Sequence, residues 1–253
     1  MTLLLFLLLP LVIMLIAMKI QANTLVVEEK TVHVEGNHKD CSLLFISDLH
    51  KRRLNDRHIK TINTVDCVIV GGDLLERTTT VETLKHNLNM LKKLSTQVIV
   101  VYGNHDYRWD QCRLRTILDQ ENITVLENEG MYISDGVYVY GTKDESTKQV
   151  IVQKRGLGDY YILVSHNPIV ALHHTNSRLY DLILSGHTHG GQIRLFGLGL
   201  RERGRWLQVG SARMRISNGF GTRKVHLRLG APPEVHHILL KKGATTSLSR
   251  ERR

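Results

Sequence analysis

Cysteine and proline are scarce in this chain of 253 residues, which has three cysteines and four prolines. Three cysteines cannot build the disulfide framework of a small secreted domain. Four prolines beside 20 glycines exclude a collagen-like chain. With 42% hydrophobic and 23% charged residues, the composition also excludes an intrinsically disordered chain. A chain of this length can bury one sizeable core without disulfides.

Positive charge is absent from the first 18 residues, which include an unbroken apolar run from Leu3 to Met18. A cleaved secretion signal has basic residues before its apolar run and small residues at its cleavage site, and this segment has neither. We therefore expect residues 1–20 to form an uncleaved, single-pass transmembrane helix in the cell membrane. A cleaved signal and a buried core helix are the alternatives. Because Lys19 and Lys30 follow the run, the positive-inside rule favours a cytoplasmic location for the rest of the chain.

Acidic residues are scarce near the C-terminus. From Arg201 onward the chain has 13 basic and 3 acidic residues, whereas residues 1–200 carry 21 of each. Such a basic region fits nucleic acid, an anionic membrane or an anionic substrate. Because the early chain is neutral and shows no basic groove interleaved with aromatic residues, we expect no nucleic acid partner. An anionic inner leaflet would attract the basic region, so we expect a membrane as a partner.

Apolar runs of strand length recur along the chain, and helical spacing lies between the early ones. From Val81 to Leu94, apolar residues are three or four positions apart, which predicts a helix. Alternating strands and helices predict an α/β sheet, and later β-rich segments predict a second sheet stacked on it. The expected strands are Leu43 to Ile46, Cys67 to Val70, Val98 to Val101, Thr124 to Leu126, Met131 to Ile133, Val137 to Tyr140, Tyr161 to Val164, Asp181 to Leu184, Trp206 to Val209, Lys224 to Leu229 and His236 to Leu240.

These patterns predict an α/β fold: a four-layer α/β/β/α sandwich of two stacked mixed sheets, preceded by one N-terminal transmembrane helix. We expect a membrane anchor at residues 1–20 and a linker with a first strand at residues 21–40. The main folded domain would follow at residues 41–243. Residues 244–253 are basic and polar, and we expect them to form a disordered tail.

Five of the apolar runs are followed by residues able to bind a metal ion. Because ligand sites gather beyond the carboxyl ends of strands in α/β sheets, these residues should converge. Their oxygen and imidazole ligands, without thiolate, suit a catalytic site for Mn²⁺, Fe or Zn²⁺. Seven ligands are too many for one catalytic ion with an open position, whereas two divalent ions that share a carboxylate would use them all. The seven are Asp48, His50, Asp73, Asn104, His166, His187 and His189.

The order of the motifs D-x-H, GD, GNHD, a lone H and GHTH, from about Leu43 to Gln192, resembles the calcineurin-like metallophosphoesterase superfamily. The continuation GHTHGGQI and the terminal GFGTRKVHLRLGAPPEVHHILL resemble its bacterial membrane-associated branch. This resemblance implies a metal-dependent phosphoric ester hydrolase with two divalent ions per chain. We take Mn²⁺ as the first choice, with Fe or Zn²⁺ as alternatives.

The resemblance also implies a role for each motif residue. It assigns one metal ion to Asp48, His50 and His189 and the other to Asn104, His166 and His187, with Asp73 bridging both. His105 would act as leaving-group acid or stabilise the transition state. Asp106 would orient the ring of His105, or would cap the turn that follows it.

Three further features allow either a functional or a plain interpretation. Arg77 would clamp phosphate or lie on the surface. Arg52, in the run Lys51-Arg52-Arg53 beside His50, would attract an anion or be solvated. Between Gly190 and Trp206, apolar residues alternate with arginines, which fits an ordinary strand and turn or a loop that enters a lipid interface. The apolar residues of that candidate membrane loop are Phe196, Leu198 and Leu200.

Together these features predict a membrane-anchored binuclear-metal phosphoesterase. It would hydrolyse a phosphodiester or pyrophosphate bond by attack of a metal-bridging hydroxide. The phosphorylated substrate would be lipid-linked or membrane-proximal. The alternatives are a nuclease, or a catalytically silent scaffold of the same fold.

Overall fold

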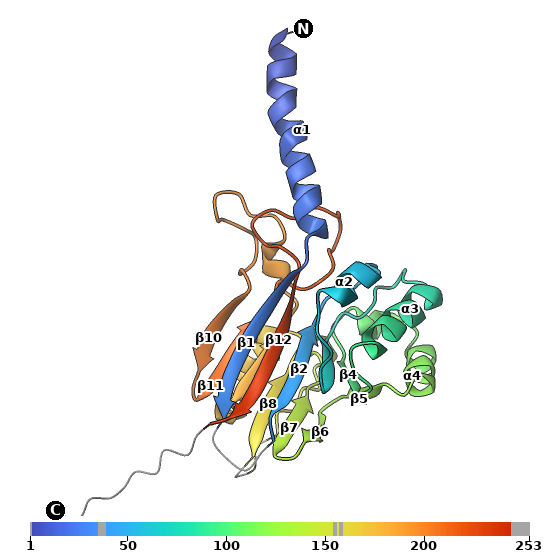
Figure 1. The fold of residues 1–253 in the computed structure, drawn as a ribbon, viewed down its shortest axis with the longest axis vertical. Coiled ribbons are helices and arrows are strands. Elements are labelled where there is room, and N and C mark those ends of the chain that lie inside the picture. Colours follow the sequence, from blue (N-terminus) through green and yellow to red (C-terminus); the bar gives the residue numbers. More distant parts are fainter. Residues whose placement is uncertain (1, 35–38, 154–155, 157–158, 244–253) are drawn as a thin grey trace, which may run out of the picture.

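Two six-stranded sheets stacked face to face form the body of the molecule (Figure 1). The computed structural model describes residues 2–34, 39–153, 156 and 159–243. The tail expected at residues 244–253 lies outside this range.

The first sheet has the strand order β1-β12-β2-β3-β4-β5. Strands β2 to β5 are parallel, whereas β12 runs antiparallel to β2 and parallel to β1. The strands are β1 Val26–Val34, β2 Cys41–Ile46, β3 Cys67–Gly71, β4 Val98–Val101, β5 Thr124–Leu126 and β12 Glu234–Lys242.

The second sheet has the order β10-β11-β9-β8-β7-β6. Its four central strands are parallel, and its two edge strands run antiparallel to their neighbours. The strands are β6 Glu129–Ser134, β7 Val137–Gly141, β8 Tyr160–Val164, β9 Leu182–Ser185, β10 Arg205–Val209 and β11 Ala212–Ile216.

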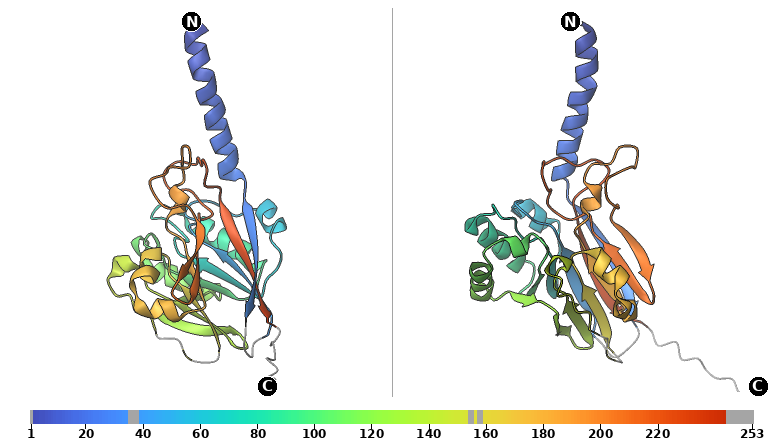
Figure 2. Two further views of the ribbon diagram at one scale, coloured as in Figure 1. Left: turned by 90° about the vertical axis from the view of Figure 1, so that its left-hand side faces the viewer. Right: turned by 180° about the vertical axis from the view of Figure 1, so that it is seen from behind.

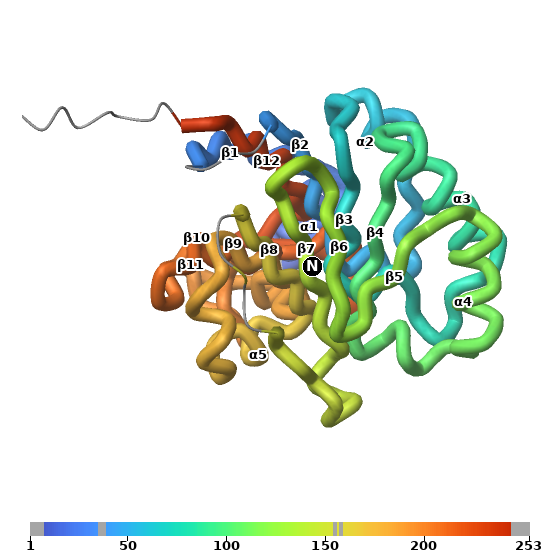
Figure 3. The backbone as a smooth tube through the Cα atoms, turned by 90° about the horizontal axis from the view of Figure 1, so that it is seen from below, coloured from blue at the N-terminus to red at the C-terminus, as the bar shows by residue number. Residues whose placement is uncertain are grey.

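Helices cover the outer faces of both sheets. Figure 3 shows α3 and α4 beyond β3 to β5, and α5 beside β8 and β9. The helices are α1 Thr2–Asn23, α2 Asp56–Lys60, α3 Val81–Lys92, α4 Gln111–Gln120 and α5 Pro168–His173, and the short 3-10 turns are η1 Asp106–Arg108, η2 Glu145–Thr147, η3 Thr175–Leu179 and η4 His189–Gly191.

Alternate residues of the parallel strands enter two different cores. In β2, Leu44 and Ile46 pack with the helix residues Leu84 and Leu88, whereas Phe45 faces the second sheet. A third apolar cluster lies between the second sheet and α5 with η3. Because both faces of these strands are buried, their sequences are continuous apolar runs. The predicted sandwich of two stacked mixed sheets is therefore confirmed.

One expected strand is wrong and one was missed. Residues 224–229 do not form a strand. The side-chain amide of Gln192 donates to the carbonyls of Val225 and Leu227 at 2.8 and 3.1 Å, and these bonds take the place of the backbone hydrogen bonds to a neighbouring strand. Strand β11 was missed because Arg213 and Arg215 interrupt its apolar pattern.

The N-terminal helix α1 projects from one end of the domain (Figure 2). We expected residues 1–20 to span a membrane. Within the part of the chain that the structure describes, no helix is both long enough and apolar enough to do so.

The last turns of α1 are docked on the domain. Met18 and Ala22 are buried. The carbonyl of Met18 accepts a hydrogen bond from the backbone N–H of Arg228 at 3.1 Å. The imidazole Nε2 of His226 lies 3.1 Å from Oδ1 of Asn23. The C-terminal end of α1 is thus part of the packed domain.

Truncation should show this docking as a loss of stability. A chain that begins at Ala17 keeps Met18 and Ala22, whereas a chain that begins at Thr24 loses both. Burial of a methionine side chain contributes roughly 1.5–3 kcal/mol, so the shorter chain should melt roughly 3–12 °C lower. Thermal unfolding of the two chains in one buffer measures the difference. Equal melting temperatures would show that the contact adds no stability.

Candidate metal centre

Five loops bring the predicted ligands together, and each loop follows the carboxyl end of a parallel strand. The loops after β2, β3, β4, β8 and β9 carry the D-x-H, GD, GNHD, lone H and GHTH motifs. Parallel strands direct their carboxyl ends to the same edge of a sheet. The two sheets are stacked, so the loops of both meet at one end of the molecule.

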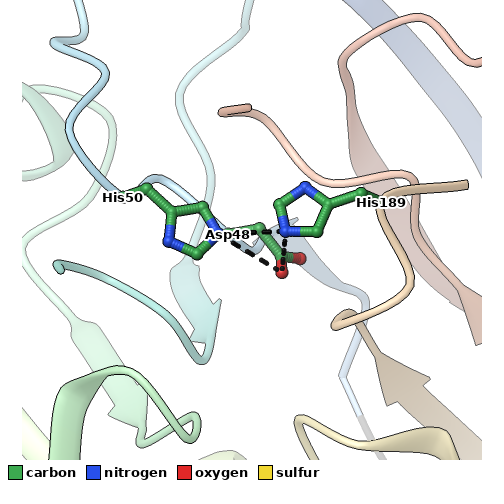
Figure 4. A group of neighbouring side chains, drawn as sticks. All are labelled: Asp48, His50 and His189. Carbon is green, nitrogen blue, oxygen red and sulfur yellow. Dashed lines mark hydrogen bonds and ion pairs between the residues drawn. The ribbon is translucent and has the colours of Figure 1, made fainter. Parts of the chain in front are cut away.

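The first ligand set is Asp48, His50 and His189, which Figure 4 shows with the two imidazole rings facing each other beside the carboxylate. The Nε2 atoms of His50 and His189 are 3.0 Å apart. Oδ1 of Asp48 lies 3.3 Å from Nε2 of His189 and 4.0 Å from Nε2 of His50. All three residues are buried, so the three donor atoms converge on one point away from solvent.

The second set is Asn104, His166 and His187. Nδ1 of His187 lies 3.1 Å from Oδ1 of Asn104 and 3.2 Å from Nε2 of His166. The other ring nitrogen of His166, Nδ1, lies 2.9 Å from the carbonyl of Gly71. A proton on Nδ1 donates to this carbonyl, so Nε2 is the nitrogen that would be turned toward a metal ion, as in many metal-binding histidines.

Asp73 lies between the two sets. Its Oδ2 is 3.3 Å from Nε2 of His166 and 3.8 Å from Nε2 of His50. Its Oδ1 accepts a hydrogen bond from the backbone N–H of His105 at 2.8 Å. Asp73 would therefore be able to hold an ion beside either ligand set through its one carboxylate.

The backbone at the ligands is strained. Five of the seven ligands have φ between +52° and +69°, a region that residues with a side chain rarely adopt. The five are Asp48, His50, Asp73, His187 and His189. The close approach of the loops also requires glycine, since a Cβ at Gly103 would collide with the Asp73 carboxylate. Such strain persists only where the surrounding structure fixes the conformation.

The charges of the two sets are coupled. Burial disfavours ionisation of Asp48 and Asp73, yet the neighbouring imidazoles hold the pKa of both carboxyls below the usual value. Burial also disfavours the charged form of His166, but Asp73 raises its pKa to about 10. Burial lowers the pKa of His189 to about 3, so its ring is neutral.

These residues fit a pair of divalent ions. Ring nitrogens of His50 and His189 face each other at 3.0 Å, a separation at which two protonated nitrogens would repel. A cation between them would accept both lone pairs, and the oxygen and nitrogen donors match catalytic rather than structural sites. The clustered His and Asp residues therefore indicate a binuclear metal site.

His105 and Asp106 have different surroundings. The ring of His105 stands edge-on to that of His50, with centroids 5.1 Å apart. The Asp106 carboxylate accepts from the backbone N–H groups of Gly103 at 2.8 Å and Leu75 at 3.1 Å. Burial, together with the charge of Asp73, raises the pKa of Asp106 to about 8. Asp106 thus joins the loops after β3 and β4, and this carboxylate has no contact with the His105 ring among the residues described.

The two candidate substrate arginines do not join the ligand cluster. Arg77 is exposed. The guanidinium of Arg52 donates to the carbonyl of Phe220 at 2.6 Å and lies over the Phe220 ring, 4.1 Å from its centroid.

The candidate membrane loop is fully accessible. Phe196, Leu198 and Leu200 are 95%, 78% and 100% exposed. The loop is joined to the ligand segment, because the guanidinium of Arg201 donates to the carbonyl of His187 at 3.1 Å.

Sequence reasoning missed Arg228, which is fully buried beside the first ligand set. Its guanidinium donates to the carbonyl of His189 at 3.3 Å and to those of Asn218 and Gly219 at 2.8 and 3.1 Å. It also donates to the carbonyls of Ala231 and Gly221. In the sequence, a single arginine between two apolar residues, Leu227 and Leu229, is the feature that points to it. Arg228 holds the segment after β11 against the ligand loops.

Glu76 was also missed as a neighbour of the ligands. One carboxylate oxygen lies 3.5 Å from Nδ1 of His50, and the other lies 3.3 Å from the ammonium of Lys51. A carboxylate beside the second nitrogen of a metal-binding histidine orients its ring.

The model of the calcineurin-like phosphoesterase family matches residues 41–191, the segment that contains all five motifs. The chain belongs to this family. It is therefore a metal-dependent phosphoesterase hydrolase.

Three relatives of this phosphoesterase come from Bacillus subtilis and cattle, and two of them are named for a metallophosphoesterase or its domain. YpbG of Bacillus subtilis is 34% identical over 208 residues, which cover 79% of this chain and 80% of YpbG. The metallophosphoesterase YkoQ of the same organism is 29% identical over 248 residues, with 86% and 92% covered. A bovine transmembrane protein with a metallophosphoesterase domain is 26% identical over 237 residues, with 79% and 52% covered.

Replacing the shared carboxylate should affect both ions of the phosphoesterase. In Asp73→Asn, the charge that lies between the two ligand sets is lost, so both sets should bind metal more weakly. We expect less than one metal ion per chain and activity reduced by at least a hundredfold. Metal analysis after gel filtration measures the stoichiometry, and Asp119→Asn on the surface of α4 is the control. Two ions per chain with near-normal turnover would disprove the bridging position.

Proposed function

We propose that this phosphoesterase hydrolyses a phosphodiester or pyrophosphate bond in a lipid-linked or membrane-proximal substrate. The observation that carries the hydrolytic part is the convergence of seven oxygen and nitrogen ligands from five loops at one end of the sheets. When bound, two divalent ions, for which we propose Mn²⁺, lower the pKa of a water molecule and neutralise phosphoryl oxygens.

His105 is our candidate for the leaving-group acid or transition-state donor. Its backbone N–H is bonded to Asp73, and its ring lies beside His50. The side chain is only partly buried, so it can reach a bound substrate. A positioned acid of this kind typically contributes 10²- to 10⁴-fold to the rate.

A membrane location is supported by two apolar surfaces at one end of the molecule. Figures 1 and 2 show the loop between η4 and β10 beside the base of α1. Phe196, Leu198 and Leu200 lie in this loop, and α1 exposes apolar side chains such as Leu9 and Ile13. Apolar tips enter the acyl boundary while arginines meet headgroup phosphates. We propose that α1 and this loop hold the catalytic domain at the cytoplasmic face of the cell membrane.

The leaving group tests the role of His105. In His105→Ala, metal content should stay at the wild-type value, because this side chain is assigned to the substrate and not to the metal ions. The rate for an alkyl phosphodiester, which has a poor leaving group, should fall by 10²-fold or more. The rate for a nitrophenyl diester should fall much less, since its leaving group needs no proton. Equal losses for both substrates would exclude the general-acid role.

The loop tests the membrane-proximal substrate. Replacing Phe196, Leu198 and Leu200 with serine removes apolar burial of roughly 1.5–3 kcal/mol per side chain at full immersion. Activity on a phospholipid in anionic vesicles should drop by more than tenfold, whereas hydrolysis of a soluble nitrophenyl diester should change little. Parallel losses on both substrates would place these residues in the catalytic fold instead. Unchanged activity on both would remove the support for a lipid substrate.

A further inference from the structure

A cavity of about 450 Å³ lies where α1 meets the domain, and none of the seven metal ligands lines it. Its walls come from four segments that are distant in sequence: the end of α1, the run after His50, α2 and the loop before Arg228. The residues that decide its character are Asn23, Arg52, Arg53, Arg57, His58 and His226. Its volume is in the range of small-molecule sites.

The charge of this cavity is one-sided. Three arginines and two histidines line it, and no acidic residue does. Arg53 forms an ion pair with Glu82 at 3.3 Å, but the arginine side chain is 48% and the glutamate side chain 81% exposed to solvent, so the pair neutralises little charge. Arg52 and Arg57 form no ion pair within residues 2–34, 39–153, 156 and 159–243. The cavity therefore has a surplus of positive charge.

Two hydrogen-bond donors face each other at its inner wall. Nδ1 of His58 accepts a hydrogen bond from the backbone N–H of Asn55 at 3.2 Å, so a neutral ring carries its proton on Nε2. That Nε2 lies 3.5 Å from a guanidinium nitrogen of Arg52, which is also a donor. Burial and the charge of Arg52 lower the pKa of His58 to about 4, which keeps the ring neutral near pH 7. An oxygen atom placed between them would accept hydrogen bonds from both donors.

A buried aromatic ring connects the wall of the cavity to the loop after β2. Phe220 packs against the Arg52 guanidinium at 4.1 Å and against the His58 ring at 5.0 Å, centroid to centroid. Its backbone N–H donates to the carbonyl of Ser47, next to the ligand Asp48. Phe220 thus contacts both donors of the cavity and is hydrogen-bonded to the loop that carries Asp48.

We propose that this cavity is a binding site for a phosphate group, separate from the metal centre. A phosphate has several strong acceptor oxygens and a negative charge, which match the arginines and the His58 Nε2 donor. The group could belong to a free phosphate compound or to a phospholipid headgroup. Asn23 and Leu25 at the base of α1 line the cavity, so the proposed membrane location would bring headgroups to its opening. The site itself rests on the cavity and not on that location.

Charge removal at the outer wall tests the site. The double variant Arg53→Gln/Arg57→Gln changes two exposed arginines and leaves Arg52, His58 and the ligands intact. The control Arg113→Gln/Arg115→Gln removes the same charge from the exposed face of α4. The full-length protein with its metal ions, in a neutral detergent, is titrated calorimetrically with inorganic phosphate and with dihexanoyl phosphatidylglycerol below its micelle concentration.

We expect a difference between the double variant and the other two proteins for at least one probe. The wild-type protein and the control should bind one more equivalent of that probe than the double variant, or should bind it at least tenfold more tightly. Phosphate bound by the metal ions is common to all three proteins, so the difference reports on the cavity. Tighter binding of the lipid identifies a headgroup site, and tighter binding of inorganic phosphate identifies a site for a free phosphate compound. Identical isotherms for all three proteins with both probes would overturn the proposal.

Hydrolysis of a soluble nitrophenyl diester separates this proposal from the proposed function. All three proteins should hydrolyse it equally, because neither variant changes a metal ligand or His105. If the diester is not hydrolysed but the binding difference is present, the phosphate site stands and the proposed reaction fails. If the double variant loses hydrolysis while the control keeps it, the cavity belongs to the catalytic site and the separate site is disproved.

Discussion

Two buried carboxylates, Asp48 and Asp73, impose the main constraint on this structure. A buried charge is costly unless oppositely charged or hydrogen-bonded groups compensate it. Imidazoles from four different loops surround the pair, and backbone N–H groups of His105 and His187 also donate to these carboxylates. Five of the ligands have a left-handed backbone, a strained conformation that the surrounding contacts must hold in place. The loops can hold it because the apolar strands beneath them are fixed on both faces.

Two buried arginines show how the rest of the domain supports this centre. Arg215 is neutralised by carboxylates, at 2.8 Å from Glu234 and 3.0 Å from Glu28, and so ties β11 to β12 and β1. Arg228 instead binds only carbonyl oxygens in the described part of the chain, including that of the ligand His189. Removing the Arg228 side chain would leave several buried carbonyl oxygens without hydrogen-bond partners. Because its own N–H is bonded to Met18, the end of α1 and the ligand loops are mechanically connected.

The end of the molecule that carries the metal centre thus combines three kinds of surface. The exposed apolar loop is joined to the ligand segment through Arg201, and α1 is joined to it through Arg228. The basic cavity lies at the base of α1. A phosphorylated molecule held at a lipid surface presents both apolar and anionic groups, and this end offers complementary partners for each.

The sequence by itself determined most of the strands, the helix at α3 and the seven candidate ligands. Each candidate ligand lies within five residues after an apolar strand, and the location of a strand tip depends mainly on that local pattern. Only the tertiary structure decided the local conformations and side-chain contacts that depend on residues far apart in the sequence. Residues 224–229 form a loop because Gln192 takes their carbonyls, and β11 is a strand because Glu28 and Glu234 neutralise Arg215. Asp106 joins two loops instead of contacting His105, and the basic cavity brings Asn23, Arg57 and His226 together. Such pairings leave no periodic signal, because the partners are separated by tens to hundreds of residues and meet only when the two sheets stack.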